Sequence, residues 1–123
     1  MLKKTRRLRC KNRVRFKLSQ RINDRNRLSI CKTNKHIYVQ LINDSIAHTL
    51  AAASTQEKLF AEKYKGSINK SNKMAAKLLA EMLLQRVKNN KISMDVVFDR
   101  RHHKYCGVVK EFASSARSFG LRF

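Results

Sequence analysis

The sequence predicts an α/β protein: a single small domain with a mixed β-sheet and packed helices, preceded by a basic N-terminal arm. Three observations support this fold class. Apolar residues alternate with polar ones near 26–32 and 36–43, which is typical of strands. Apolar residues recur at helical spacing over 71–88 and 108–119, which is typical of amphipathic helices. A chain of 123 residues with a net charge of +21 leaves room for one core and a basic extension.

The arm is assigned to residues 1–22, which are rich in Lys and Arg and contain no acid. Residues 1–35 hold 14 of the 29 Lys and Arg residues and one of the 8 acids, so more than half of the excess charge lies there. Cys10, Val14 and Leu18 form only a narrow apolar stripe at helical spacing. Like charges four residues apart oppose a free helix. We therefore expect the arm to be mobile when free and helical on RNA.

The domain, assigned to residues 23–123, begins with a predicted β-hairpin. Period-2 alternation indicates strands near 26–32 and 36–43, joined by the polar turn Thr33-Asn34-Lys35. A second turn over 43–45 leads to a third predicted strand over 46–53. This third strand is predicted from context, because alanine is a poor strand former.

The string STQE at 54–57 fits the capping box S/T-x-x-E/Q. It predicts the start of a short helix that runs to about Tyr64 and stops near Gly66. A longer helix is predicted over 71–88, with Ser71 as its cap, and the asparagines that follow it can end it.

A compact apolar strand over 95–99 follows, bounded by two aspartates. The last helix is predicted over 108–119, with apolar residues along one face. Gly120 lies where a C-terminal glycine cap is expected. The order of elements therefore favours helices packed on a mixed sheet.

The charge predicts the class of partner. A small protein this basic repels itself unless it meets a polyanion, and phosphates attract any Lys or Arg. A charge run is more often a solvated face, but this run lacks compensating acids, so we favour nucleic acid. The longest apolar run, 50–53, is far too short to span a membrane, and no secretory signal is expected.

Two enzyme or metal interpretations are weaker. His102, His103 and Cys106 are close in sequence but lack a second ligand pair at zinc spacing, so no metal or cofactor is expected. The three cysteines are scattered and predict no disulfide. Asp95 and Asp99 flank one strand but would lie about 13 Å apart, too far to share a metal with or without Asp44. We expect no enzymatic activity.

Basic and aromatic residues together make the stronger pattern. Arg100, Arg101, Lys104 and Tyr105 follow the fourth strand, where arginine can fork onto phosphate and tyrosine can stack on bases. A similar mixture surrounds the first hairpin turn, with Lys32, Lys35, His36 and Tyr38. If strands one, two and four are neighbours, both clusters join the arm in one surface. The alternatives are cross-strand packing for Tyr38, and for Arg100 a salt bridge to Asp99 or Asp95.

At these segments the sequence resembles bacterial-type ribosomal protein eighteen of the large subunit (L-eighteen). The matching strings, in family order, are RLSI at 27–30, HIYVQ at 36–40, TLAAAST at 49–55, VFDR at 97–100, KYCG at 104–107, and the tail from Ala113 through Ala116-Arg117 to GLRF at 120–123. They span nearly the full length of the chain.

The resemblance implies a small α/β domain and a structural ribosomal protein in the central protuberance. Members of this family bind 5S rRNA, help attach it to the large-subunit rRNA, and work beside ribosomal protein five. It implies a monomer within the ribosome, with no cofactor and no membrane. The runner-up is a basic RNA-binding module outside the ribosome. The abundance of Lys and Asn suggests an AT-rich genome, and we favour the cytoplasm of a bacterium over an organellar ribosome.

The candidate RNA-binding residues combine the arm, the hairpin and the loop after the fourth strand. They are Lys3, Lys4, Arg6, Arg7, Arg9, Lys11, Arg13, Arg15, Lys17, Arg21, Arg25, Arg27, Lys32, Lys35, His36, Tyr38, Gln40, Arg100, Arg101, Lys104 and Tyr105.

Overall fold

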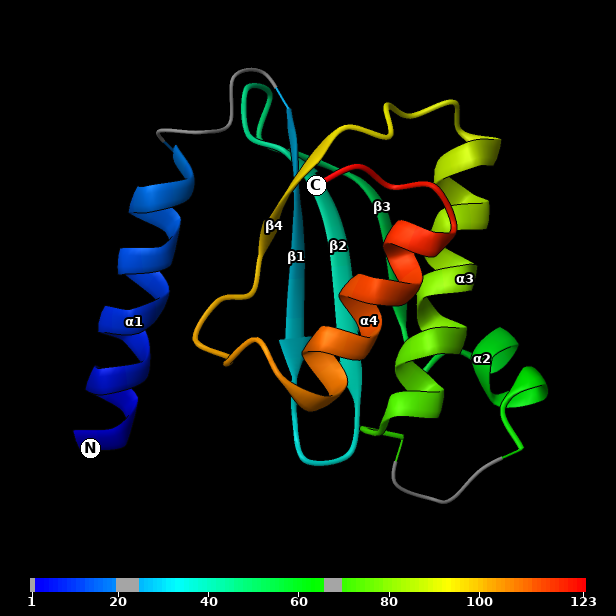
Figure 1. The fold of residues 1–123 in the computed structure, drawn as a ribbon, viewed down its shortest axis with the longest axis horizontal. Helices are drawn as coiled ribbons and strands as arrows, with labels where there is room; N and C mark the ends of the chain where they lie inside the picture. Colours follow the sequence, from blue (N-terminus) through cyan, green and yellow to red (C-terminus); the bar gives the residue numbers. More distant parts are fainter. Residues whose placement is uncertain (1, 20–24, 66–69) are drawn as a thin grey trace.

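The computed structural model describes residues 2–19, 25–65 and 70–123, and it contains the predicted α/β domain with a helical N-terminus (Figure 1). The elements in chain order are α1 (Leu2–Ser19), β1 (Asn26–Lys32), β2 (Ile37–Asn43), β3 (His48–Ser54), α2 (Lys58–Lys63), α3 (Lys73–Asn89), β4 (Val96–Asp99) and α4 (Gly107–Ser118).

The four strands form one sheet in the order β3-β2-β1-β4. β1 and β2 are antiparallel, as are β2 and β3, whereas β1 and β4 are parallel. The predicted mixed sheet is confirmed, and β4 lies beside β1 as the proposed joint surface requires. The chain returns to β4 through α3, which is the usual way to connect parallel strands.

The hydrophobic core lies between one face of the sheet and α3 and α4. The alternation of β1 and β2 directs Leu28, Ile30, Val39 and Leu41 into this core, where each is at most 1% exposed. Phe112 of α4 is fully buried in the same cluster. Burial of apolar surface on this one face stabilises the fold and leaves the other face of the sheet for other roles.

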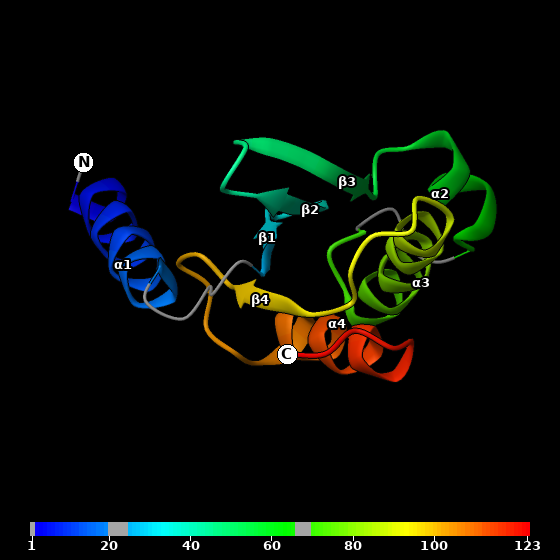
Figure 2. The ribbon, with the colours of Figure 1, turned by 90° about the horizontal axis from the view of Figure 1, so that it is seen from above.

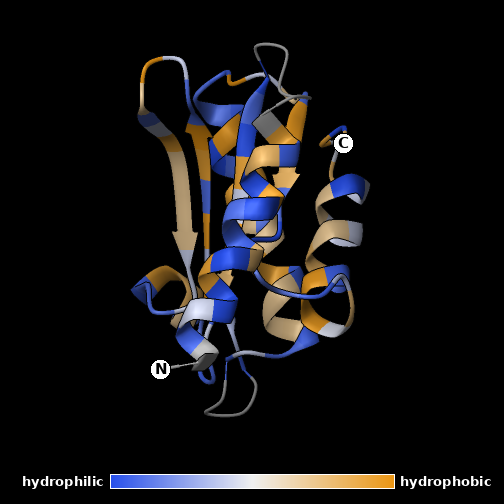
Figure 3. Ribbon diagram, turned by 90° about the vertical axis from the view of Figure 1, so that its left-hand side faces the viewer, coloured by the Kyte–Doolittle hydropathy of each residue, from blue (hydrophilic) through white to orange (hydrophobic). Residues whose placement is uncertain are grey.

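Helix α1 lies on the other side of the sheet, beyond the end of β4 (Figure 2). The stripe predicted from Cys10, Val14 and Leu18 is half-buried, whereas most of the helix surface is exposed. Seen from this side, hydrophilic residues dominate the helix (Figure 3). In the described part of the chain, no helix is both long and apolar enough to cross a bilayer.

The start predicted for the third strand is wrong. β3 begins at His48 because residues 44–47 form a turn instead. In this turn Asn43 Oδ1 accepts a hydrogen bond from Ser45 N at 3.0 Å, and Ala47 adopts a φ of 50°. Ile46 is 64% exposed at the tip, so its apolar character does not mark a strand.

The predicted capping box is also wrong. Ser54 ends β3, and Glu57 makes no side-chain cap at the start of α2. Instead the Glu57 carboxylate pairs with both terminal nitrogens of Arg86 on α3. This ion pair lowers the pKa of Glu57, because the guanidinium donates to its charged form. The predicted stop at Gly66 lies outside the described residues.

The ends of α3 differ from the prediction by small shifts. Asn72, not Ser71, caps the helix, with its Oδ1 accepting from Ala75 N at 2.9 Å. Ser71 Oγ instead donates to Thr33 O, which ties the helix start to the first hairpin. At the other end the left-handed residue is Lys91 rather than an asparagine. Gly120 has a φ of 120° after α4, as the predicted glycine cap requires.

Candidate nucleic-acid interface

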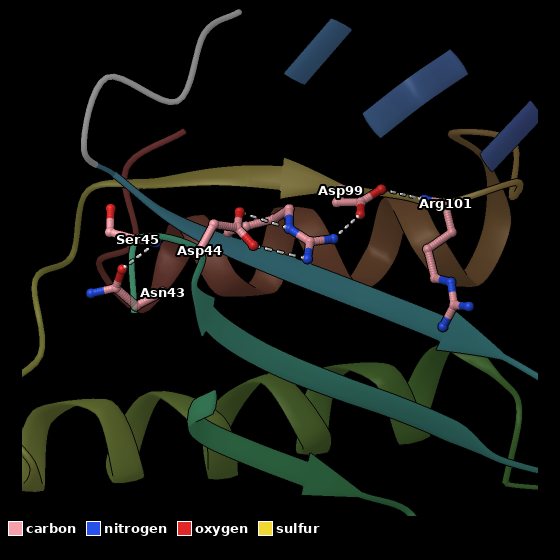
Figure 4. A network of polar contacts seen from close by, with 6 residues as sticks. Asn43, Asp44, Ser45, Asp99 and Arg101 are labelled. Atoms are coloured by element: carbon pink, nitrogen blue, oxygen red, sulfur yellow. Dashed lines mark hydrogen bonds and ion pairs between the residues drawn. The ribbon is translucent and has the colours of Figure 1, made fainter. Parts of the chain in front are cut away.

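The loop after β4 is held in place by a buried carboxylate. Asp99 is fully buried at the end of β4, and its Oδ1 accepts the backbone N–H of Arg101 at 2.9 Å. Arg101 has a φ of 55°, a left-handed conformation that needs such support. Arg100 Nη1 donates to His103 O at 2.7 Å and closes the loop from within. Figure 4 shows Arg101 held at its backbone while its side chain extends toward β1.

The same loop is also fastened to the end of β1. The Nε2 atom of His103 accepts the backbone N–H of Lys32 at 3.0 Å, which requires the neutral ring. The rings of His102 and His103 lie 4.2 Å apart between centroids. The Lys32–His103 hydrogen bond connects positions 71 residues apart in the chain and brings Lys32 of the predicted hairpin cluster to the loop after β4.

Helix α1 brings its charges to this loop. A hollow between them is lined by Lys4, Thr5, Arg7, Leu8, Lys11, Arg101 and His102. A second hollow, at the end of β1, is lined by Arg7, Cys31, Lys32, Thr33, Asn34, His102, His103 and Lys104. Among the residues that the structure describes, no acidic side chain lines either hollow.

The charges around these hollows repel one another. Partial burial, with the neighbouring Arg101 and Arg15 charges, lowers the pKa of Lys11. Partial burial and the charges of Arg7 and Arg101 lower the pKa of His102 in the same way. A surface whose cations disfavour one another is stabilised by an added polyanion, so this arrangement suits phosphate groups.

The face of the sheet opposite the core adds a third hollow. Ser29, Cys31, Tyr38 and Gln40 point to this face as cross-strand neighbours, and they line the hollow together with Arg101. We name the three hollows, with the loop 100–104 and the α1 residues that line them, the basic interface.

Arg27 has a different environment. Its Nη1 lies 2.7 Å from Asp99 Oδ2, and its Nε lies 3.1 Å from Asp44 Oδ2. The Arg27 side chain is only 13% exposed, so its charge is balanced inside the protein. The alternative predicted for Arg100, a salt bridge to Asp99 or Asp95, is wrong because Arg27 and Arg122 pair with those acids.

Other candidates lie away from the basic interface. His36 Nδ1 is 3.0 Å from Thr55 Oγ1, and Lys35 lies in the exposed hairpin turn. The Tyr105 hydroxyl accepts from Arg117 Nη1, and its ring meets Phe98 edge-on. Arg25 precedes β1 at the end opposite Lys32.

The remaining candidates belong to the arm. Those exposed on α1 outside the lining of the hollows are Arg6, Arg9, Arg13, Arg15 and Lys17. Lys3 lies in α1 with its side chain outside the described part, and Arg21 lies outside the described residues.

Ser29, Cys31, Thr33 and Asn34, with Thr5 and Leu8 of α1, also line the hollows, although they are not among the predicted RNA-binding residues. A signal was available for the first two, because the alternation that buries Leu28 and Ile30 directs their neighbours to the opposite face. Thr33 and Asn34 were predicted only as turn residues. No pattern indicates that this turn meets the loop after β4.

The acids of the imagined nuclease triad are engaged otherwise. Asp44 and Asp99 pair with Arg27, and Asp95 pairs with Arg122. Within residues 2–19, 25–65 and 70–123, no three His, Cys, Asp or Glu side chains converge in a metal-binding cluster.

The hydrogen bond to His103 predicts a pH-dependent stability. Burial, together with the charges of His102 and Lys32, lowers the pKa of His103 to about 4. The unfolded chain, with a His pKa of about 6.5, binds more protons below that pH, so stability is lost as pH falls from 6.5 toward 4. Because the residue is half-buried, solvent screening reduces the effect to roughly 1 kcal/mol, or about 4 °C in Tm.

Melting curves of the free protein at pH 7.5 and 5.5 measure this loss. His103→Gln keeps an acceptor for Lys32 N but does not titrate, so its Tm should fall less than that of the wild type. His48→Gln, at an exposed position, is the matched control and should behave as the wild type. Equal losses in the wild type and His103→Gln would contradict this role.

Comparison with known proteins gives a full-length match. The family model described as ribosomal L18 of archaea, bacteria, mitochondria and chloroplast matches residues 1–123. The large ribosomal subunit protein uL18 of Ehrlichia ruminantium (strain Gardel) is 47% identical over 116 residues, covering 94% of this chain and 92% of the relative. The uL18 protein of Chlamydia pneumoniae is 50% identical over 97 residues, covering 79% and 76%.

Proposed function

The chain belongs to the ribosomal L18 family of the large subunit, and on that premise we propose that it binds 5S rRNA through the basic interface and arm. It is a ribosomal protein and not an enzyme. The proposal extends to attachment of 5S rRNA to the large-subunit rRNA in the central protuberance, beside ribosomal protein five. We place it in the cytoplasmic ribosomes of a bacterium, in keeping with its bacterial relatives.

One observation supports RNA binding most directly. Cations from α1, the end of β1 and the loop after β4 converge around hollows, although they come from distant parts of the chain, and no acid of the described residues lines these hollows. Such convergence costs electrostatic free energy unless phosphates neutralise it. The open sheet face adds Tyr38 and Gln40, which offer a stacking face and an amide.

The candidate residues take different roles in this proposal. Residues 1–22 act as the arm, whose exposed Lys and Arg side chains neutralise phosphates along the RNA. Arg101, Lys32 and Lys104 contact the RNA from the domain. Arg100 shapes the loop through its hydrogen bond to His103 O, and Arg27 balances the buried carboxylate of Asp99 and the exposed one of Asp44 rather than a phosphate.

The alternative of an RNA-binding module outside the ribosome has less support. The family match covers the whole chain rather than an isolated segment. The relatives that it resembles are named as proteins of the large ribosomal subunit.

Gradient sedimentation tests the attachment. Labelled 5S rRNA is mixed with large-subunit particles that lack 5S rRNA and this protein, with ribosomal protein five present throughout. We expect the label to sediment with the particles only when the chain is added, and less so with the triple variant Lys4→Gln, Arg7→Gln, Lys11→Gln. Equal sedimentation with and without the chain would contradict the proposal.

A further inference from the structure

We propose that the hollow beneath Arg101 is a subsite for a single backbone phosphate of RNA, and that Asp99 is the positioning residue that holds Arg101 over it. This inference rests on the proposed function and names one contact within it. The subsite is the hollow lined by Ser29, Cys31, Tyr38, Gln40 and Arg101 on the open face of the sheet.

The size and lining of the hollow suit a small anion. It measures about 230 Å³, and the described residues that line it offer a guanidinium, two hydroxyls and an amide but no carboxylate. These groups come from fixed positions on paired strands, since Ser29 lies opposite Gln40 and Cys31 opposite Tyr38. A rigid floor of donors beside an arginine favours a phosphate, whose oxygens accept several hydrogen bonds at once.

The Arg101 side chain supplies a donor that the described residues leave unsatisfied. Its Nε is buried and makes no hydrogen bond with the residues that the structure describes. A buried donor left unsatisfied costs free energy, and a buried donor on a charged group costs more. A phosphate oxygen in the hollow would satisfy this N–H and balance the charge. The unsatisfied donor is therefore the feature that distinguishes Arg101 from the exposed cations of α1.

Asp99 accounts for the position of Arg101. One carboxylate oxygen accepts the Arg101 N–H at 2.9 Å, and the other accepts from Arg27 Nη1 at 2.7 Å. Arg27 is fixed in turn by Asp44, so the carboxylate belongs to a chain of contacts that starts at the β2–β3 turn (Figure 4). The left-handed Arg101 then extends its side chain toward β1.

The role of Asp99 can be separated from its charge. Replacing Asp99 with Ala removes a negative charge from an RNA-binding protein, and charge alone predicts tighter binding. The positioning role predicts the opposite, because Arg101 would lose its anchor. Asp44 is the matched control, since it pairs with the same Arg27, whereas the Arg101 N–H donates to Asp99. Asp44 still pairs with Arg27 when Asp99 is absent, so the variant does not leave an isolated arginine.

The experiment measures affinity for 5S rRNA at several salt concentrations, with thermal melts of each variant. We expect Arg101→Gln to bind about tenfold more weakly, with the slope of log K against log salt reduced in magnitude by roughly 0.7–0.9, as for one lost phosphate. Asp99→Ala should lose a similar factor and Asp44→Ala should lose none. The double variant Asp99→Ala, Arg101→Gln should bind no more weakly than Arg101→Gln, because both changes remove one contact.

Three results would each overturn the proposal: an unchanged slope in Arg101→Gln, binding by Asp99→Ala as tight as the wild type, or equal losses in Asp44→Ala and Asp99→Ala. Arg101 lies outside the core, so its variant tests the subsite even if Asp99→Ala does not fold. A wild-type chain without preference for 5S rRNA would contradict the proposed function instead. In that case, the change in salt slope caused by Arg101→Gln would be measured with a length-matched control RNA.

Discussion

Deletion of residues 1–20 is expected to weaken 5S rRNA binding by about 10²-fold or more while the domain still folds. The deleted segment carries nine Lys and Arg residues and no acid. Each phosphate neutralised adds roughly 0.7–0.9 to the salt slope, so the loss of several contacts is large at physiological salt. The truncated chain should show a visibly shallower salt dependence as well as a lower affinity.

The domain should survive this deletion because its core lies on the far side of the sheet from α1. The core is made by the sheet, α2, α3 and α4, and the half-buried positions of α1 contribute little to it. We expect the melting temperature to change by only about 5 °C, near what 1 kcal/mol produces in a domain of this size. Filter binding and thermal melts on both chains measure the two effects.

Charge-matched variants separate geometry from total charge. Lys4, Arg7 and Lys11 line the hollow beside Arg101, whereas Arg6, Arg9 and Arg13 do not. Replacing either set with Gln removes three charges, and we expect the first set to cost more affinity. Unchanged affinity after the deletion, or loss of the folded domain, would contradict the division into arm and domain.

Local sequence patterns correctly predicted the elements whose structure is determined by their own residues. β1 has the predicted bounds, because its alternation is strict and its core face is buried. The third strand was predicted too early, because Ile46 is apolar yet lies exposed in a turn. The capping box failed because the partner of Glu57 is Arg86, which is 29 residues away and on another helix. A distant ion pair leaves no local signal.

The same distinction between local patterns and long-range contacts applies to the candidate site. Residue types and charge predicted a basic, partly aromatic surface, and the order of strands places its parts together. The buried link from Arg27 to Asp99 spans 72 residues and could not be predicted, so Arg27 was grouped with exposed arginines. The neutral ring of His103, within the basic loop after β4, likewise has its hydrogen-bond partner, the Lys32 N–H, on a distant strand. Such contacts depend on the tertiary fold rather than on spacing in the sequence.

The affinity of the full chain for 5S rRNA should exceed its affinity for a length-matched control RNA by about 10²-fold or more. Non-specific binding follows charge alone, whereas specific binding adds contacts that only the correct RNA shape satisfies. The loop after β4 is fixed by Asp99, Arg100 and His103, and such preorganised groups favour one arrangement of phosphates. We expect the exposed arm residues, in contrast, to contact any RNA.

The most direct test is therefore the ratio of the two dissociation constants, measured for the full chain at one salt concentration near 0.15 M. We expect 5S rRNA to bind about 10²-fold more tightly or better, and we expect Arg13→Ala, at an exposed α1 position outside the basic interface, to weaken both RNAs about equally and leave the ratio unchanged. A ratio close to one at this salt concentration would contradict this expectation, because the basic interface would then bind RNA by charge alone.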